Sequence, residues 1–394
     1  MENFRTLQVN RGIPRQTLWT VIVMAMLTVA NLHYNVPLLE SIRVSMGASP
    51  LEANIVTVLT QGGYAFGLLF IVALGDLFDA RKVILGNFCV LVAALLLMAL
   101  GRHMVWLWVA SVLTGLSSVA VQMYIPMVSK YSRPHDKARH VGYVVSGIIV
   151  GVLLGRTLGG LIGAWVGWRW LYGGAALLMV LCAWVAKGLL PPMDVGFRGT
   201  YGGLLRSIVG IVKEWPEVWA GALRSAFAFA AFNVLWACMA FHLAGEPFRR
   251  GSETVGLLCL CGLLTSMAVA NMGKYVDRWG VRRFNRAGFI LMALAWCVLG
   301  LWGNGYGGLI AGIVLLDVGH QSVGVANQSH VLSLSPQASN RINTVYMTIY
   351  FLGGTLGTLL AGLGWKYLGW QGIVITGLGL VLMGVTAGWM TRRK

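Results

Sequence analysis

Long uncharged runs follow one another along almost the whole chain, separated by short charged segments. No Asp, Glu, Lys or Arg occurs, for example, in 16–39, 103–129 or 225–245. A helix needs about 20 apolar residues to cross the hydrocarbon core of a bilayer. The runs do not alternate with period two, so they predict membrane-spanning helices and not the strands of a barrel. Twelve spans are expected, at 17–40, 51–75, 83–101, 105–129, 140–165, 169–189, 217–243, 254–273, 286–302, 308–330, 342–365 and 369–390.

The composition excludes a soluble protein. Of the 394 residues, 57% are hydrophobic and only 11% are charged, whereas soluble domains carry about 25% charged residues. All six cysteines fall within the expected spans, so we interpret them as small buried apolar residues and not as a disulfide framework. The first apolar run is too long for a cleavable signal peptide and no small-residue cleavage site follows it.

The net charge of +17 reflects membrane topology and not nucleic-acid binding. With the N-terminus inside, the cytoplasmic segments are the two tails and the loops that follow the second, fourth, sixth, eighth and tenth spans. These segments hold 22 of the 30 Lys and Arg residues, and the loops on the other side of the membrane hold six. Basic residues concentrate on the cytoplasmic side of membrane proteins. We therefore expect a multi-pass protein of a bacterial inner membrane with both termini in the cytoplasm.

The two halves of the chain resemble each other. At an offset of 202 residues, Arg139, Gly155, Gly160 and Trp168 fall on Arg341, Gly357, Gly362 and Trp370, and at an offset of 201 Asp76 falls on Asp277. Ordered matches of this kind predict a duplication. We expect an N-terminal six-helix bundle (1–189), a cytoplasmic central loop (190–216) and a C-terminal six-helix bundle (217–394). Such repeats are typical of transporters whose site lies at the bilayer midplane between them.

Similar charged turns follow the second and eighth spans. Each places an acid at a helix end and basic residues one turn later. We hypothesise that Asp76 pairs with Arg341, and Asp277 with Arg139, when the cytoplasmic side is closed; alternatively, these charges only enforce topology. The residues of this cytoplasmic latch are Asp76, Arg81, Lys82, Arg139, Asp277, Arg278, Arg282, Arg283 and Arg341.

A few ionisable residues lie inside the expected spans. Asp317 is the only acid well inside a span, and Arg156 lies at the middle of the fifth. Charged groups at this depth are functional candidates by default. Burial favours a neutral carboxyl group and a nearby cation favours its ionised form, so Asp317 is the candidate proton carrier, with Arg156, His33 and His320 as further proton-coupling candidates. The alternatives are a static Asp317–Arg156 ion pair and histidines that serve only as hydrogen-bonding groups.

Other polar residues recur along single faces of the apolar helices. Such stripes predict a water-filled cavity that binds the substrate, since lipid would not solvate them. The candidates for its lining are Asn31, Tyr34, Asn35, Gln61, Tyr64, Gln122, Arg224, Asn233, Gln321, Asn327, Tyr346 and Tyr350.

The turn at 273–283 and its weaker counterpart at 74–82 resemble the loop signature of the major facilitator superfamily. Gly142, Gly151, Gly155-Arg156 and Gly159-Gly160 resemble the antiporter motif of its proton-coupled drug exporters, although Arg156 replaces the proline of that motif. A ridge of small residues that lets helices pack closely would explain these glycines equally well. Stretches 31–39, 61–67 and 343–354 resemble bacterial members of the drug:proton antiporter-like branch. The resemblance implies an all-α, twelve-helix fold of two pseudo-symmetric bundles and, beyond it, efflux by proton exchange.

Together these features predict a secondary active transporter that works by alternating access. The expected activity is proton-coupled efflux of a small organic solute, anionic or zwitterionic because Arg156 and Arg224 lie in or near the cavity with one acid, Asp317, to offset them. No phosphate-binding loop or zinc-type ligand cluster is present in the sequence, so we expect no cofactor, no enzymatic activity and a monomer in the bilayer. The alternatives are an importer or facilitator on the same fold and a non-transporting membrane receptor or sensor.

Overall fold

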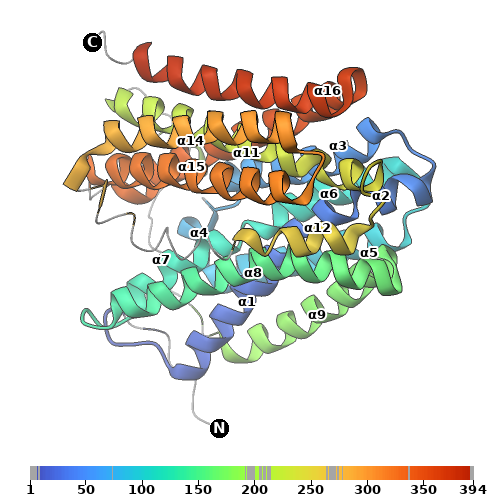
Figure 1. Ribbon diagram of the computed structural model, residues 1–394. Helices are drawn as coiled ribbons and strands as arrows, with labels where there is room; N and C mark the ends of the chain where they lie inside the picture. The colour runs from blue at the N-terminus through green and yellow to red at the C-terminus, as the bar shows by residue number, and fades with distance from the viewer. Residues whose placement is uncertain are drawn as a thin grey trace.

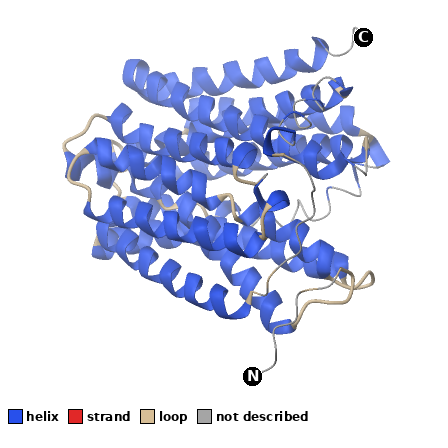
Figure 2. Cartoon of the chain, turned by 180° about the vertical axis from the view of Figure 1, so that it is seen from behind, coloured by secondary structure: helices blue, strands red, loops and turns tan. Residues whose placement is uncertain are grey.

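The computed structural model describes residues 7, 9–72, 74–190, 192, 200–203, 206, 210, 214–262, 265, 272, 275–276, 278–335 and 338–390. Every regular element within these ranges is an α-helix, which confirms the predicted all-α multi-pass class (Figure 2). The helices are α1 (Arg15–His33), α2 (Asn35–Met46), α3 (Pro50–Phe70), α4 (Leu74–Leu77), α5 (Ala80–Leu100), α6 (Met104–Ser118), α7 (Val121–Tyr131), α8 (Lys137–Val166), α9 (Trp168–Leu189), α11 (Pro216–Ala244), α12 (Ser252–Leu258), α14 (Val281–Trp302), α15 (Tyr306–Ser333) and α16 (Ser339–Met390).

Ten helices in the described part of the chain are long and apolar enough to cross a membrane. The spans expected at 342–365 and 369–390 together form α16, whose chain reverses at Gly369. Its φ of 56° lies in the left-handed region, which a glycine adopts without strain. The span expected at 254–273 begins with α12, and most of its remaining residues lie outside the described ranges.

Two expected spans are interrupted helices. The first divides at Tyr34 into α1 and α2. Pro37 follows three residues later and has no N–H to donate to the carbonyl of His33, so the helical ladder breaks there. The fourth divides into α6 and α7, and the amides that follow the break bond three residues back, with Gln122 N donating to Val119 O at 2.9 Å. Both breaks lie within the membrane-spanning length.

Glycines bring equivalent helices together in the two halves of the chain. A Cβ atom at Gly155 of α8 would lie 2.7 Å from the carbonyl oxygen of Ala30 in α1. A Cβ atom at Gly357 of α16 would lie 2.3 Å from the carbonyl oxygen of Ala230 in α11. These are the contacts expected of a duplicated unit, while the boundaries at 1–189, 190–216 and 217–394 stay a prediction.

We call helices α1–α9 the first group and helices α11–α16 the second group. Figure 1 shows the first group, in blue to green, mostly below and the second group, in yellow to red, mostly above, with α12 reaching down beside α8 and α3 lying near α16. A Cβ atom at Gly160 would lie 2.4 Å from Ser252 O, and one at Gly362 would lie 2.3 Å from Asn54 Nδ2. Both close contacts lie at the end of the helices that adjoins the loop at 47–49 and the loop at 245–251, which we call the contact end.

Candidate functional site

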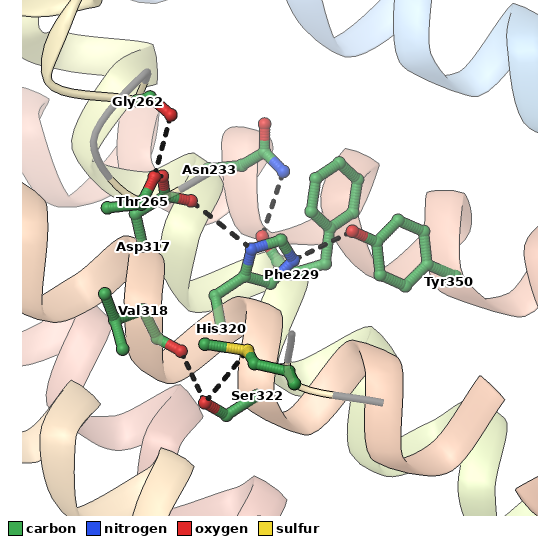
Figure 3. Close-up of polar contacts among 10 residues, drawn as sticks. Phe229, Asn233, Gly262, Thr265, Asp317, Val318, His320, Ser322 and Tyr350 are labelled. Atoms are coloured by element: carbon green, nitrogen blue, oxygen red, sulfur yellow. Dashed lines mark hydrogen bonds and ion pairs between the residues drawn. The ribbon is translucent and has the colours of Figure 1, made fainter. Parts of the chain in front are cut away.

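Asp317 lies on α15 inside the second group and is only 7% exposed. The hydroxyl of Thr265 donates a hydrogen bond to Asp317 Oδ2. His320, one turn further along α15, places Nδ1 at 4.0 Å from Asp317 Oδ1 (Figure 3). No described residue donates a hydrogen bond to Oδ1, so one face of this carboxyl group is available to a proton or a ligand.

His320 connects Asp317 to α16. Its Nε2 atom shares a hydrogen bond of 2.8 Å with the hydroxyl of Tyr350 (Figure 3). A neutral imidazole carries one proton, so a ring that accepts from Tyr350 at Nε2 carries its proton on Nδ1, toward Asp317. Tyr350, His320 and Asp317 therefore form a row of polar groups between two helices, hydrogen-bonded at Tyr350 and separated by 4.0 Å at Asp317. The structure thus brings together the proton candidates Asp317 and His320 predicted from the sequence.

An aromatic cluster covers this path. Phe229 stacks on Tyr350 with ring centroids 4.1 Å apart, and Phe232 stacks on His320 at 4.7 Å. With Trp236, the two phenylalanines lie at i, i+3 and i+7 on one face of α11. These rings were not among the residues predicted from the sequence, although their helical spacing beside Asn233 was a usable signal. They surround the charged residues with apolar, polarisable surface.

Arg156 reaches from α8 in the first group to this aromatic face. Its Cζ atom lies 5.2 Å from the Trp236 ring centroid and 5.9 Å from that of Phe232, within range of a cation–π interaction. Its Nε atom is enclosed and has no hydrogen-bond partner among the described residues. Arg156 interacts electrostatically with Asp317, yet no ion pair within 4.0 Å joins the two in the described chain, so the structure does not form the static pair considered above.

Amide and hydroxyl groups link the two groups of helices nearer the contact end. Gln61 of α3 donates from Nε2 to Asn233 Oδ1 at 2.9 Å and accepts from the Thr358 hydroxyl at 3.2 Å. Asn54, two turns earlier on the same face of α3, donates from Nδ2 to the carbonyl of Thr358 at 2.8 Å. We call these four residues the amide bridge. Gln61 and Asn233 were predicted site residues, whereas Asn54 and Thr358 were not.

Most of the other predicted cavity residues bond within their own group, and His33 lies near Arg156 and not beside Asp317. The pairs are Asn31 with Leu27 O, Asn35 with Thr60, Gln122 with Tyr64, Arg224 with Asn327, Tyr346 with Ser225, and the ring of Tyr34 with that of Tyr172. The ring of Tyr64 also packs against that of Phe351 in the second group, tilted by 53° with the centroids 4.5 Å apart. Gln321 is half-buried on α15.

The predicted latch pairs lie outside the described residues, because Asp277 and the side chain of Asp76 are not described. Arg139 forms an ion pair of 2.6 Å with Asp136, three residues earlier. Arg81 donates to the carbonyl of Lys187. The other basic members of the latch, Lys82, Arg278, Arg282, Arg283 and Arg341, are exposed. The latch therefore stays a prediction.

Comparison with known proteins places this geometry among transporters. The sequence profile of the Major Facilitator Superfamily matches residues 18–244. The chain is 32% identical to the uncharacterized transporter YgaY of Escherichia coli O157:H7 over 92% of each chain, and 32% identical to a Streptomyces coelicolor protein named "Probable transporter" over 92% of this chain and 83% of the relative. It is 24% identical to a Haemophilus influenzae protein named "Probable sugar efflux transporter" over 77% of this chain and 70% of the relative. The crystal structure of the nucleoside transporter NupG matches with a TM-score of 0.79 at 12% identity, over 96% of this chain and all of that one.

Proposed function

Because the chain belongs to the major facilitator superfamily and is therefore a multi-pass membrane transporter, we propose that it exports a small organic solute in exchange for protons, as in the drug:proton antiporter-like branch. The observation that carries this proposal is the position of Asp317. It is a buried acid with one oxygen bonded to Thr265 and the other facing His320 at 4.0 Å. A carboxyl group placed in this way can hold a proton or release it without being locked in an ion pair.

Alternating access couples the movement of the solute to that of the proton. The two groups of helices tilt against each other, so that Asp317 and Arg156 face first one side of the membrane and then the other. With both termini in the cytoplasm, the contact end faces outward, and its close contacts at Gly160 and Gly362 close the external side. Opening to the outside breaks these contacts and the amide bridge, and admits a proton to Asp317. Opening to the cytoplasm releases the proton as the solute binds.

The rest of the proposal follows from the composition and the relatives. The solute carries a negative charge, alone or together with a positive one, because Arg156 and Arg224 lie within the spans. The protein works as a monomer in a bacterial inner membrane. The H. influenzae relative whose name specifies efflux supports export over import.

The test uses everted inner-membrane vesicles that contain the protein and an acid interior generated by respiration. A pH-sensitive dye reports the gradient while candidate organic solutes are added one at a time to the outer medium, which corresponds to the cytoplasm. A solute that is exchanged for protons dissipates the gradient in wild-type vesicles. Asp317→Asn vesicles are expected to keep the gradient because an amide cannot carry the proton, and Glu217→Gln, at an exposed acid of α11, is expected to behave like wild type.

Two results would contradict the proposal. Normal gradient dissipation by Asp317→Asn would remove Asp317 from the coupling mechanism. Solute counterflow in liposomes without any proton gradient, combined with no dissipation in vesicles, would identify a facilitator. Dissipation only when the solute is loaded inside the vesicles would identify a proton-coupled importer.

A further inference from the structure

We propose that the transported solute is a zwitterion whose carboxylate and ammonium groups lie at opposite ends of a flat apolar body, with the carboxylate at Arg156 and the ammonium at Asp317. The inference rests on the proposed function and narrows its substrate class. Three features of the structure carry it: a cation that no described acid pairs with, an acid with one oxygen that no described residue bonds, and an aromatic ring that lies near the cation and stacks on the histidine facing the acid.

Arg156 is the first feature. A buried guanidinium is normally paired with an acid and hydrogen-bonded. Here no described residue accepts a hydrogen bond from it and no described carboxylate lies within 4.0 Å, while its Nε atom is enclosed. The aromatic faces of Trp236 and Phe232 stabilise the cation but accept no conventional hydrogen bond. A carboxylate would satisfy the planar fork of N–H donors with two parallel bonds.

Asp317 is the second feature. Its Oδ2 atom accepts from Thr265, whereas Oδ1 has no hydrogen-bond donor in the described chain. The ionisable groups that face it are His320 from its own helix, Arg156 from α8, Tyr350 from α16 and Cys261 after α12. Arg156 is the only permanent cation among these groups and does not touch the carboxylate. An ammonium group of a ligand at Oδ1 would supply the missing donor.

Phe232 is the third feature, because its ring lies near Arg156 and against the histidine that faces Asp317. The ring centroid is 5.9 Å from Arg156 Cζ, and the ring stacks on His320 with centroids 4.7 Å apart. A ligand that reaches both Arg156 and Asp317 therefore passes this ring. A flat body with charges at both ends can stack on the ring while its ends reach the two residues, whereas an α-amino acid carries both charges at one carbon and has no apolar body between them.

The effect of the solute's charge on proton binding at Asp317 then favours a zwitterion over an anion or a cation. An anion alone at Arg156 would favour protonation of nearby Asp317, so proton and solute would bind together and move in the same direction. A cation alone would compete with the proton at Asp317 but would leave Arg156 unpaired. A zwitterion does both: its ammonium displaces the proton and its carboxylate pairs with Arg156. Only this class combines exchange for protons with a satisfied arginine.

The experiment measures binding to the purified full-length protein in detergent by thermal shift, since a ligand raises the melting temperature according to its affinity. The probes are 4-(aminomethyl)benzoate as the zwitterion, 4-methylbenzoate as the anion, 4-methylbenzylamine as the cation and phenylalanine as the adjacent-charge control. The same four charge patterns on a biphenyl scaffold test a longer body. We expect a separated zwitterion on one of the two scaffolds to bind best, and its affinity to fall as the pH is lowered because protons compete at Asp317.

Substitutions at Arg156 and Asp317 test which charged end of the ligand each residue binds. Arg156→Gln is expected to weaken the zwitterion and the anion about tenfold, the size expected for a charged hydrogen-bonded pair, and to leave the cation unchanged. Asp317→Asn is expected to weaken the zwitterion and the cation and to abolish the pH dependence. Arg102→Gln and Glu217→Gln, at exposed positions, are the matched controls. Arg156→Lys keeps the charge and is expected to retain more zwitterion binding than Arg156→Gln, which separates a ligand contact from a folding defect.

The outcomes distinguish this inference from the proposed function. If no separated zwitterion binds, or if the singly charged probes bind equally well, the inference is wrong. It is also wrong if Arg156→Gln and Asp317→Asn affect all probes alike. Exchange of some other solute for protons in the vesicle assay would then still uphold the proposed function. Conversely, the expected binding pattern without gradient dissipation by any solute would overturn proton exchange, and with it the argument from linkage.

Discussion

Tyr350 connects α16 to the acidic residue of the site through a single hydroxyl group. Tyr350→Phe removes its hydrogen bond to His320 Nε2 but retains the ring that stacks on Phe229. We expect a loss of stability of about 1 kcal/mol and severalfold slower proton exchange, because His320 is no longer held with Nδ1 toward Asp317. The vesicle assay measures the rate, with Tyr367→Phe at a 73% exposed position of the same helix as control. Equal rates for the two variants would exclude Tyr350 from the path.

At this scale, the sequence predicted the charged residues better than their partners. Asp317, His320 and Arg156 were recognisable because ionisable groups are rare in apolar helices. Phe232 and Thr265 were not recognised, because apolar and hydroxyl residues are ordinary constituents of any span. That Arg156 rests on Phe232 and Trp236 without an ion pair to Asp317 depends on the placement of α8 against α11, which no local pattern specifies.

Among the helices, α8 has a face of glycines that packs against α1. Gly155→Val and the equivalent Gly357→Val are expected to destabilise the protein by about 1–3 kcal/mol each, the usual range for overpacking, because the added atoms meet the backbone of Ala30 or Ala230. Thermal unfolding in detergent measures the loss. Gly142→Val is the control, since no atom lies within 4 Å of a Cβ atom there. If the Gly155→Val and Gly142→Val variants had the same melting temperature, close helix packing would not explain the glycines of α8.

Most elements were predictable from the uncharged runs, because a bilayer demands helices of a given length. The break at Tyr34 and the division of the fourth span into α6 and α7 were not predicted. Pro37 was visible in the sequence, but proline is tolerated inside membrane helices and does not by itself fix where a helix ends. The junction at Gly369 was correctly placed, since Lys366 and the glycines mark it.

For the molecule as a whole, the contact end is where the two groups of helices meet closely. Gly160→Ala places a methyl group against Ser252 O, where a Cβ atom would lie 2.4 Å away, and should push the groups apart there. A cysteine introduced at Leu51, which contacts Gly362 at the second close contact, reports the opening. We expect an impermeant maleimide to label Leu51→Cys in intact cells faster when Gly160→Ala is present, relative to the same reporter with Gly174→Ala, whose Cβ would meet no atom within 4 Å. Unchanged labelling would show that this end does not open outward.

The repeat predicted that equivalent residues of the two halves make equivalent contacts, as Gly155 and Gly357 do. It did not predict the amide bridge, because its members Asn54 and Gln61 have no identical counterparts at the repeat offsets. The shared framework could thus be inferred from the sequence, whereas the two α3 residues that join the groups belong to the first half alone.

The contact of Arg156 with rings on the opposite group also bears on the rate of transport. When the groups tilt without the solute, with or without a proton on Asp317, the guanidinium must leave Phe232 and Trp236 with no anion to accompany it. A carrier loaded with the solute moves the arginine already neutralised by its cargo. We therefore expect the solute-free return step to be slower than the solute-carrying step, so that the return of the protonated carrier limits the rate of the whole exchange cycle.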